Sequence, residues 1–170
     1  DHYAGFHLAL MPSFCVGFEA TAIDDVGGNP GPLAVPADAA LALVQHLRAE
    51  GFDPAISRKM RVDHGFSQPL ARLFGSNDRY PIIPVFIDPM TPPFARFART
   101  RSFGEAVGRF AARSGKRTLF IGSGGMSHHP ARYYPLPGTA TPEVAAWQLE
   151  GPEGGPVRAC DDHQCAAMDL

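Results

Sequence analysis

Two histidines follow apolar segments of this 170-residue chain directly, in positions where ligand chemistry collects in α/β proteins. His64 comes after Asp63, and His128 comes after the glycine-containing run 124–127. An imidazole exchanges protons near neutral pH and also binds metal ions. The two side chains therefore indicate acid–base catalysis, metal binding or activation of a nucleophile, with Asp63 as a candidate to orient the His64 ring. A structural role for both histidines is the alternative.

Three other histidines have simpler interpretations. His46 is expected on the solvated face of a helix, and His7 in a strand. His163 lies in the segment 160–165, whose cysteines and aspartates superficially resemble a metal cluster. A structural zinc site usually combines two pairs of ligands at matched spacing, and this is a single cluster. We therefore do not expect a metal ion at this segment.

Common nucleotide-binding and hydrolase motifs are absent from the sequence. The glycines at 27–28 and 122–125 form neither GxGxxG nor GxxxxGK[ST]. The segment 121–125 approaches the GxSxG pattern without matching it, and HExxH does not occur. These absences argue against a dehydrogenase, a kinase or a common hydrolase.

The charge balance of the chain is nearly neutral. Lysine and arginine number 15 against 17 aspartates and glutamates, which gives a formal net charge of −2. We therefore expect no nucleic-acid partner and no anionic membrane partner, and no apolar run approaches the length of a membrane span. Three cysteines at 15, 160 and 165 are too few for a disulfide framework, so a cytoplasmic location is expected. The first residue is not Met, which suggests a processed or truncated start.

The pattern of apolar and turn-forming residues predicts several strands. Strands are expected within Phe6–Ala22 and over Ala55–Val62, with a surface loop over Asp24–Pro36 between them. The segment Tyr80–Asp88 is continuously apolar, which is typical of a strand buried on both faces. The segment Arg117–Ser123 is expected to be another buried strand for the same reason.

Helices are expected between these strands. One begins at Ala37 and is capped by Gly51, because apolar residues recur there at spacings of three and four. These apolar residues are Ala37, Ala40, Leu41, Val44 and Leu47. A polar bend over Asp63–Pro69 leads into a short helix through Phe74, and Arg99–Ser114 is expected to form a second long helix.

The alternation of strands and helices predicts the α/β class, with His64 and His128 in loops that leave strand ends. Past Pro130 the periodic pattern deteriorates, and the segment 151–170 has few apolar residues at regular spacing. We expect residues 1–150 to form one domain and residues 151–170 an atypical C-terminal tail.

Four motifs resemble those of the class III extradiol ring-cleavage dioxygenases. They are Asp1–Tyr3 (DHY), Val62–Leu70 (VDHGFSQPL), Pro84–Ile87 (PVFI) and Gly122–His128 (GSGGMSH). The motifs stand in the family's order and at similar separations, which is more specific than any one of them alone. The likeness runs from residue 1 to about residue 130 and weakens beyond it.

This resemblance implies a three-layer α/β/α sandwich around a mainly buried sheet, with residues 1–150 as a partial catalytic domain. It implies Fe(II)-dependent cleavage of a catechol, such as 2,3-dihydroxyphenylpropionate, by O2. By resemblance, His2 is an iron ligand, and His64 and His128 are catalytic acid–base groups. Asp63 and His129 would support them from outside the first layer of contacts. A homo-oligomer is expected.

The sequence departs from the family pattern at the iron ligands. The family has a further iron-binding histidine ahead of the point where this chain begins, and its carboxylate ligand lies well downstream. Glu143, Glu150 and Glu153 do not match that carboxylate. The alternative expectation is therefore an inactive fragment or a non-enzymatic scaffold relative with an incomplete metal site. A metal-dependent hydrolase on a similar scaffold is a third, weaker expectation.

Overall fold

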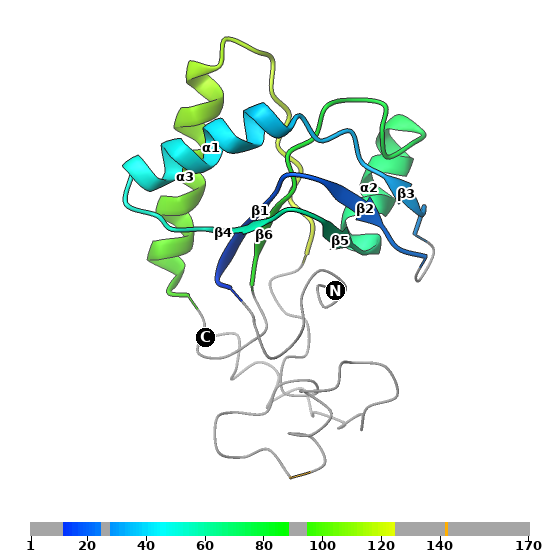
Figure 1. Ribbon diagram of the computed structural model, residues 1–170, viewed down its shortest axis with the longest axis horizontal. Coiled ribbons are helices and arrows are strands. Elements are labelled where there is room, and N and C mark those ends of the chain that lie inside the picture. The colour runs from blue at the N-terminus through cyan, green and yellow to red at the C-terminus, as the bar shows by residue number, and fades with distance from the viewer. Residues whose placement is uncertain (1–11, 25–27, 89–94, 125–141, 143–170) are drawn as a thin grey trace.

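The structure is a computed structural model that describes residues 12–24, 28–88, 95–124 and 142 (Figure 1). Within these residues the chain forms six short strands and three helices. The strands make two sheets of three strands each. No helix in this part of the chain combines the length and the apolar character that crossing a membrane demands.

The first sheet has β1 (Phe14–Gly17) at its centre. β4 (Ala55–Ser57) pairs with β1 in parallel, and β6 (Val85–Ile87) pairs with its other edge in antiparallel fashion. At the end of β1, a Cβ atom on Gly17 would lie 2.8 Å from Cγ of Pro84. Such a contact is too close for any side chain, so this position requires glycine.

The second sheet has β2 (Ala20–Ala22) at its centre. β5 (Met60–Val62) pairs with β2 in parallel, and β3 (Gly31–Pro32) pairs with it in antiparallel fashion. β3 lies within the segment that was expected to be only a surface loop, and its two residues are the part of that segment that pairs with a strand.

The same two chain segments contribute to both sheets. The segment 14–22 forms β1 and then β2, and the segment 55–62, which pairs with it, forms β4 and then β5. The Phe18 N–H donates to the Ser57 carbonyl at 2.8 Å, and the Met60 N–H donates to the Glu19 carbonyl at 2.8 Å. The predicted strand over 55–62 is therefore two strands, because it follows a partner segment that bends at residues 18–19.

The first predicted helix is confirmed as α1 (Ala37–Ala49), which is followed by Gly51 at a φ of 82°. Its buried residues are Ala40, Leu43, Val44 and Leu47. Leu41, one of the periodic apolar residues, is 43% exposed, whereas Leu43 is buried. The buried face of α1 is therefore centred on Ala40, Leu43, Val44 and Leu47.

The other two helices are α2 (His64–Phe74) and α3 (Phe97–Arg113). The long helix expected over 99–114 is confirmed as α3, which begins two residues earlier. α1 and α3 lie together at one side of the strands, and α2 lies beside β2 and β5 (Figure 1).

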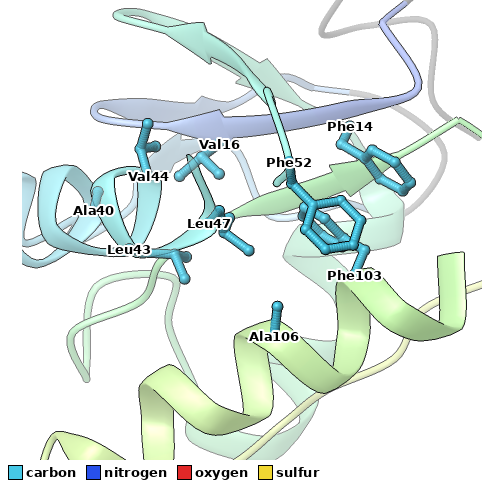
Figure 2. Close-up of a cluster of buried hydrophobic side chains, with 9 residues drawn as sticks. All are labelled: Phe14, Val16, Ala40, Leu43, Val44, Leu47, Phe52, Phe103 and Ala106. Carbon is cyan, nitrogen blue, oxygen red and sulfur yellow. The ribbon is translucent and has the colours of Figure 1, made fainter. Parts of the chain in front are cut away.

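Three phenylalanine rings form the centre of the larger hydrophobic core (Figure 2). The Phe14 ring of β1 stacks on the Phe103 ring of α3, with centroids 4.2 Å apart and planes at 8°. Phe52 meets both rings edge-on, at centroid distances of 6.1 Å and 5.4 Å. Leu43, Val44 and Leu47 of α1 complete this core from the other helix.

Neighbouring residues of β1 enter two different cores. Phe14 and Val16 belong to the core beneath α1 and α3, whereas Cys15 belongs to a second core that includes Leu70 of α2 and Phe86 of β6. This follows from strand geometry, because successive side chains point to opposite faces. The predicted α/β class is confirmed as a mixed α/β fold.

The strand predicted over Tyr80–Asp88 is shorter and less buried than expected. Only Val85–Ile87 pairs as β6, since Pro81 and Pro84 have no N–H to donate to a sheet. Phe86 is buried and Val85 packs against the larger core, but Ile87 is 37% exposed, so the second face of β6 is only partly covered.

The prediction of a buried strand over Arg117–Ser123 was wrong. None of its residues belongs to a strand, and Leu119 and Phe120 are 67% and 60% exposed. A continuous apolar run becomes a buried strand only where neighbouring strands and helices cover it. The part of the chain that the structure describes does not provide that cover.

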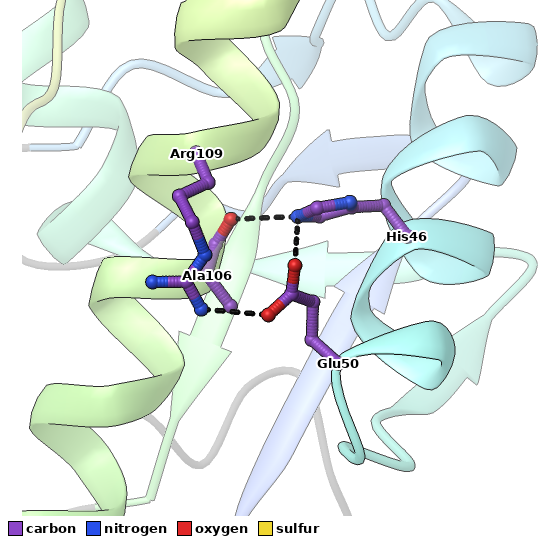
Figure 3. A network of polar contacts seen from close by, with 4 residues as sticks. All are labelled: His46, Glu50, Ala106 and Arg109. Atoms are coloured by element: carbon purple, nitrogen blue, oxygen red, sulfur yellow. Dashed lines mark hydrogen bonds and ion pairs between the residues drawn. The ribbon is translucent and has the colours of Figure 1, made fainter.

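Polar groups tie α1 to α3 (Figure 3). His46 Nε2 lies 3.0 Å from the Ala106 carbonyl oxygen and donates its proton to it, and the same nitrogen lies 3.8 Å from Glu50 Oε1. Arg109 donates from its guanidinium to Glu50 Oε2 at 2.8 Å. The imidazole is only 12% exposed, so the prediction of a solvated face for His46 was wrong, whereas its structural role is supported.

Replacing Phe103 with Ala should lower the free energy of unfolding by about 3–5 kcal/mol, because it removes the ring at the centre of the larger core. Phe97→Ala is the matched control, since Phe97 lies on the same helix and is 77% exposed. Urea unfolding of both variants measures the difference. Equal losses in the two variants would contradict the assigned core.

The ion pair between Glu50 and Arg109 should make the stability of the fold depend on pH. The hydrogen bond from Arg109 lowers the pKa of the Glu50 carboxyl below its usual 4.5. The unfolded chain therefore binds this proton at a higher pH than the folded chain, and stability falls as the pH drops through that range. Glu50→Gln should cost stability at neutral pH and cost progressively less below about pH 4.5.

The control is Glu105→Gln, which removes an exposed carboxylate that pairs with Arg101 on the same helix. Thermal unfolding midpoints over a pH series measure both variants against the parent chain. A Glu50→Gln deficit that persists unchanged at acidic pH would refute the ion pair as its cause.

Candidate functional site

The parallel strands β2 and β5 end at the same edge of the second sheet. Ala22 pairs with Val62, and the Ile23 N–H donates to the Val62 carbonyl at 2.9 Å. The residues that follow both strands therefore leave the sheet side by side. Ligands of α/β sheets bind where loops leave the carboxyl ends of the strands, and His64 comes two residues after β5.

Asp63 is the N-cap of α2. Its carboxylate Oδ1 accepts a hydrogen bond from the Gly65 N–H at 2.8 Å, and its backbone carbonyl accepts from Phe66 and Ser67 at 3.0 Å and 3.1 Å. Losing such a cap typically costs about 1 kcal/mol. A role for Asp63 in orienting the imidazole of His64 stays a prediction.

The cap corrects the expected position of His64. The segment 63–69 was predicted as a polar bend with His64 in a loop, but His64 is the first residue of α2. The reason is local, because the Asp63 side chain satisfies an N–H that a helix start would otherwise leave unpaired. The half-buried imidazole is thus held on a helix rather than on a loop.

Ser67 and Asn77 hold the backbone that follows β2. Ser67 is completely buried one helical turn after His64, and its Oγ accepts the Asn29 N–H at 3.2 Å. The Asn77 side-chain amide donates to the Asn29 carbonyl oxygen. Both backbone polar groups of Asn29 are therefore held by buried side chains, one from α2 and one from the segment that follows it.

Sequence reasoning did not single out Ser67, Asn29 or Asn77. The segment that contains Asn29 was interpreted as a surface loop, and a serine or asparagine has no distinctive spacing. Ser67 stands three positions after His64, a spacing that places two residues on one helix face, but the segment was predicted as a bend and the spacing therefore gave no signal.

Cys15 is not a candidate nucleophile. Its thiol is buried at the centre of the first sheet, and burial raises its pKa to about 11. The thiolate, which is the reactive form, is therefore scarce at neutral pH.

The structure does not test every predicted site residue. His64 and Asp63 are adjacent at the end of β5, whereas His2, His128 and His129 lie outside the described residues. Among the described residues, no group of three or more histidine, cysteine, aspartate or glutamate side chains could hold a metal ion. These residues by themselves do not fit an iron site.

The comparison with protein families gives a match over most of the chain. A model described as the catalytic LigB subunit of aromatic ring-opening dioxygenase matches residues 1–157. The boundary predicted at residue 150 is not tested by this match and stays a prediction.

Three relatives are named 2,3-dihydroxyphenylpropionate/2,3-dihydroxicinnamic acid 1,2-dioxygenases, the first with the suffix 2. The protein of Dechloromonas aromatica is 46% identical over 160 residues, which cover 93% of this chain and 49% of the relative. That of Paraburkholderia xenovorans is 51% identical over 153 residues, with 89% and 47% covered. That of Cupriavidus necator is 48% identical over 161 residues, with 94% and 50% covered.

The chain spans about half the length of these relatives. The family model nevertheless covers both described motifs, the one that carries Asp63 and His64 and the one that contributes β6. The resemblance expected from four short motifs is thus confirmed along nearly the whole sequence, and the chain belongs to the family of aromatic ring-opening dioxygenases.

Proposed function

We propose that the protein opens the aromatic ring of a catechol beside its two hydroxyl groups, with Fe(II) as cofactor and O2 as co-substrate. The observation that carries this proposal is the family match over residues 1–157. The relatives named for 2,3-dihydroxyphenylpropionate support that compound, or one close to it, as the substrate.

The described geometry supports His64 as a residue of the proposed site. It stands at the carboxyl edge of two parallel strands, half-buried, at the start of a capped helix. An imidazole there can accept a proton from a catechol hydroxyl and later return one to the opened product. We propose His64 as an acid–base group for this reason.

The other proposed roles come from the family resemblance. His128 would be the second acid–base group and His2 an iron ligand, with His129 and Asp63 in supporting positions. When bound, Fe(II) would supply the electron transfer that activates O2. Because both oxygen atoms of O2 enter the product of a dioxygenase, no external reductant is required.

Several further parts of the proposal stay predictions. They are the three-layer α/β/α arrangement, the atypical tail over 151–170, a homo-oligomeric state, a cytoplasmic location and the absence of nucleic-acid and membrane partners. None of them is needed for the chemistry proposed at His64.

The first test is iron content followed by oxygen uptake in the same sample. After anaerobic reconstitution with Fe(II), the protein should hold near-stoichiometric iron, consume oxygen when 2,3-dihydroxyphenylpropionate is added, and form a yellow product. Bound iron without oxygen uptake would argue against ring cleavage. Neither iron nor uptake would favour the alternative of a scaffold relative.

Substitutions at two histidines should separate proton transfer from metal binding. His64→Ala should retain iron but lower the rate of ring cleavage by about 100-fold or more, because it removes a positioned acid–base group. His2→Ala should deplete iron instead. Metal analysis and oxygen uptake measure both variants.

His46→Ala is the control, assayed well below its unfolding midpoint, because it removes an imidazole that contacts α3 rather than the site. Iron loss in His64→Ala would show that this residue is a ligand and not a proton carrier. Full iron retention in His2→Ala would refute its assignment as a ligand.

A further inference from the structure

Two buried side chains, Ser67 and Asn77, hydrogen-bond the backbone of Asn29. We call these two hydrogen bonds the grip, and we propose that the grip positions Asn29 as part of the surface that contacts the substrate, here called the wall of the site. Ser67 and Asn77 would be positioning residues that fix Asn29 next to α2, the helix that begins with His64, so that substrate meets a preformed surface there. This inference rests on the proposed function and deepens it, because it names residues that set substrate affinity without touching the reacting atoms.

The contacts define the grip. The Ser67 hydroxyl accepts from the Asn29 N–H at 3.2 Å, and the Asn77 amide donates to the Asn29 carbonyl. Ser67 is completely buried and Asn77 is only 4% exposed. Hydrogen bonds shielded from water hold their partners more firmly than exposed ones.

The grip lies at the edge of the sheet where His64 stands. β2 and β5 run in parallel, and His64 follows β5 by two residues. Asn29 stands two residues before Gly31, which pairs with Ala22 at the end of β2. Ser67 is three positions after His64 on α2, so both residues lie on the same side of the helix. The hydroxyl that binds Asn29 and the imidazole are therefore parts of one rigid element.

Asn77 indicates a role beyond stability. Its Oδ1 atom is buried and has no hydrogen-bond partner among the described residues. A buried acceptor without a hydrogen bond lowers the stability of the fold. An apolar side chain would therefore suit this position better than asparagine if the residue served packing alone. Its amide N–H is what the Asn29 carbonyl requires, and proteins accept such a cost mainly where a position matters for function.

The position of a wall affects binding more than chemistry. A wall contacts parts of the substrate that do not react, and these contacts are equal in the bound substrate and in the transition state. Weakening the grip should therefore raise KM and leave kcat nearly unchanged. A loss of His64 function would give the opposite pattern.

The test compares the variants Ser67→Ala and Asn77→Ala with the variant Ser102→Ala, each made in the full natural protein and loaded with iron. Ser102 is the matched control, because its hydroxyl bonds only to the Ala98 carbonyl on the exposed side of α3 among the described residues. Both grip variants should raise KM for 2,3-dihydroxyphenylpropionate about 10-fold, with kcat changed far less. The Asn29 amide should exchange its hydrogen faster in Ser67→Ala, and the control should change neither quantity.

The outcomes separate this inference from the function on which it rests. If the parent protein cleaves no catechol, the proposed function fails and this inference fails with it. If the parent is active and both folded grip variants keep the parent KM, only the positioning role is refuted. If Ser67→Ala does not fold, Asn77→Ala decides, because it releases the carbonyl of the same residue, Asn29.

Discussion

Everything described in this chain depends on the central place of β1. Its successive side chains enter two cores, so three residues, Phe14, Cys15 and Val16, connect the core of α1 and α3 to the core that includes Leu70 of α2. The stacked rings of Phe14 and Phe103 fix α3 to one face of the strand. Cys15 on the opposite face joins the core in which α2 packs, and α2 begins with His64. The position of the imidazole is thus linked through one strand to a helix on the far side of the sheet.

The sequence predicted those elements whose stability comes from neighbours close in the chain. α1 and α3 follow from apolar residues at spacings of three and four, and their ends are within two residues of the prediction. The strands were less predictable, because a strand exists only where a second segment pairs with it. The run over 117–123 has the composition of a buried strand, but no described segment covers it.

For the candidate site, types of residue were easier to predict than their settings. His64 and Asp63 could be named as candidates from the sequence, because His64 follows a predicted strand and both residues stand in a motif that resembles the family's, Val62–Leu70. The position of these residues at the start of a helix was harder to predict, because Asp63 serves as an N-cap only when the residues after it form a helix. The contacts of Asn29 with Ser67 and Asn77 join positions 38 and 48 residues apart, and no local pattern encodes such pairs.

The exposed run Leu119–Ile121 has a consequence for how this chain behaves in concentrated solution. Three adjacent apolar side chains are exposed there, and none of the three residues belongs to a strand among the described residues. Such a segment can add to the edge of a strand in another molecule, so turbidity should depend on concentration even where the fold itself is intact. Lys116 and Arg117 stand immediately before the run, both exposed, and their like charges repel between stacked copies. Salt, which screens that repulsion, would therefore make the chain less soluble rather than more.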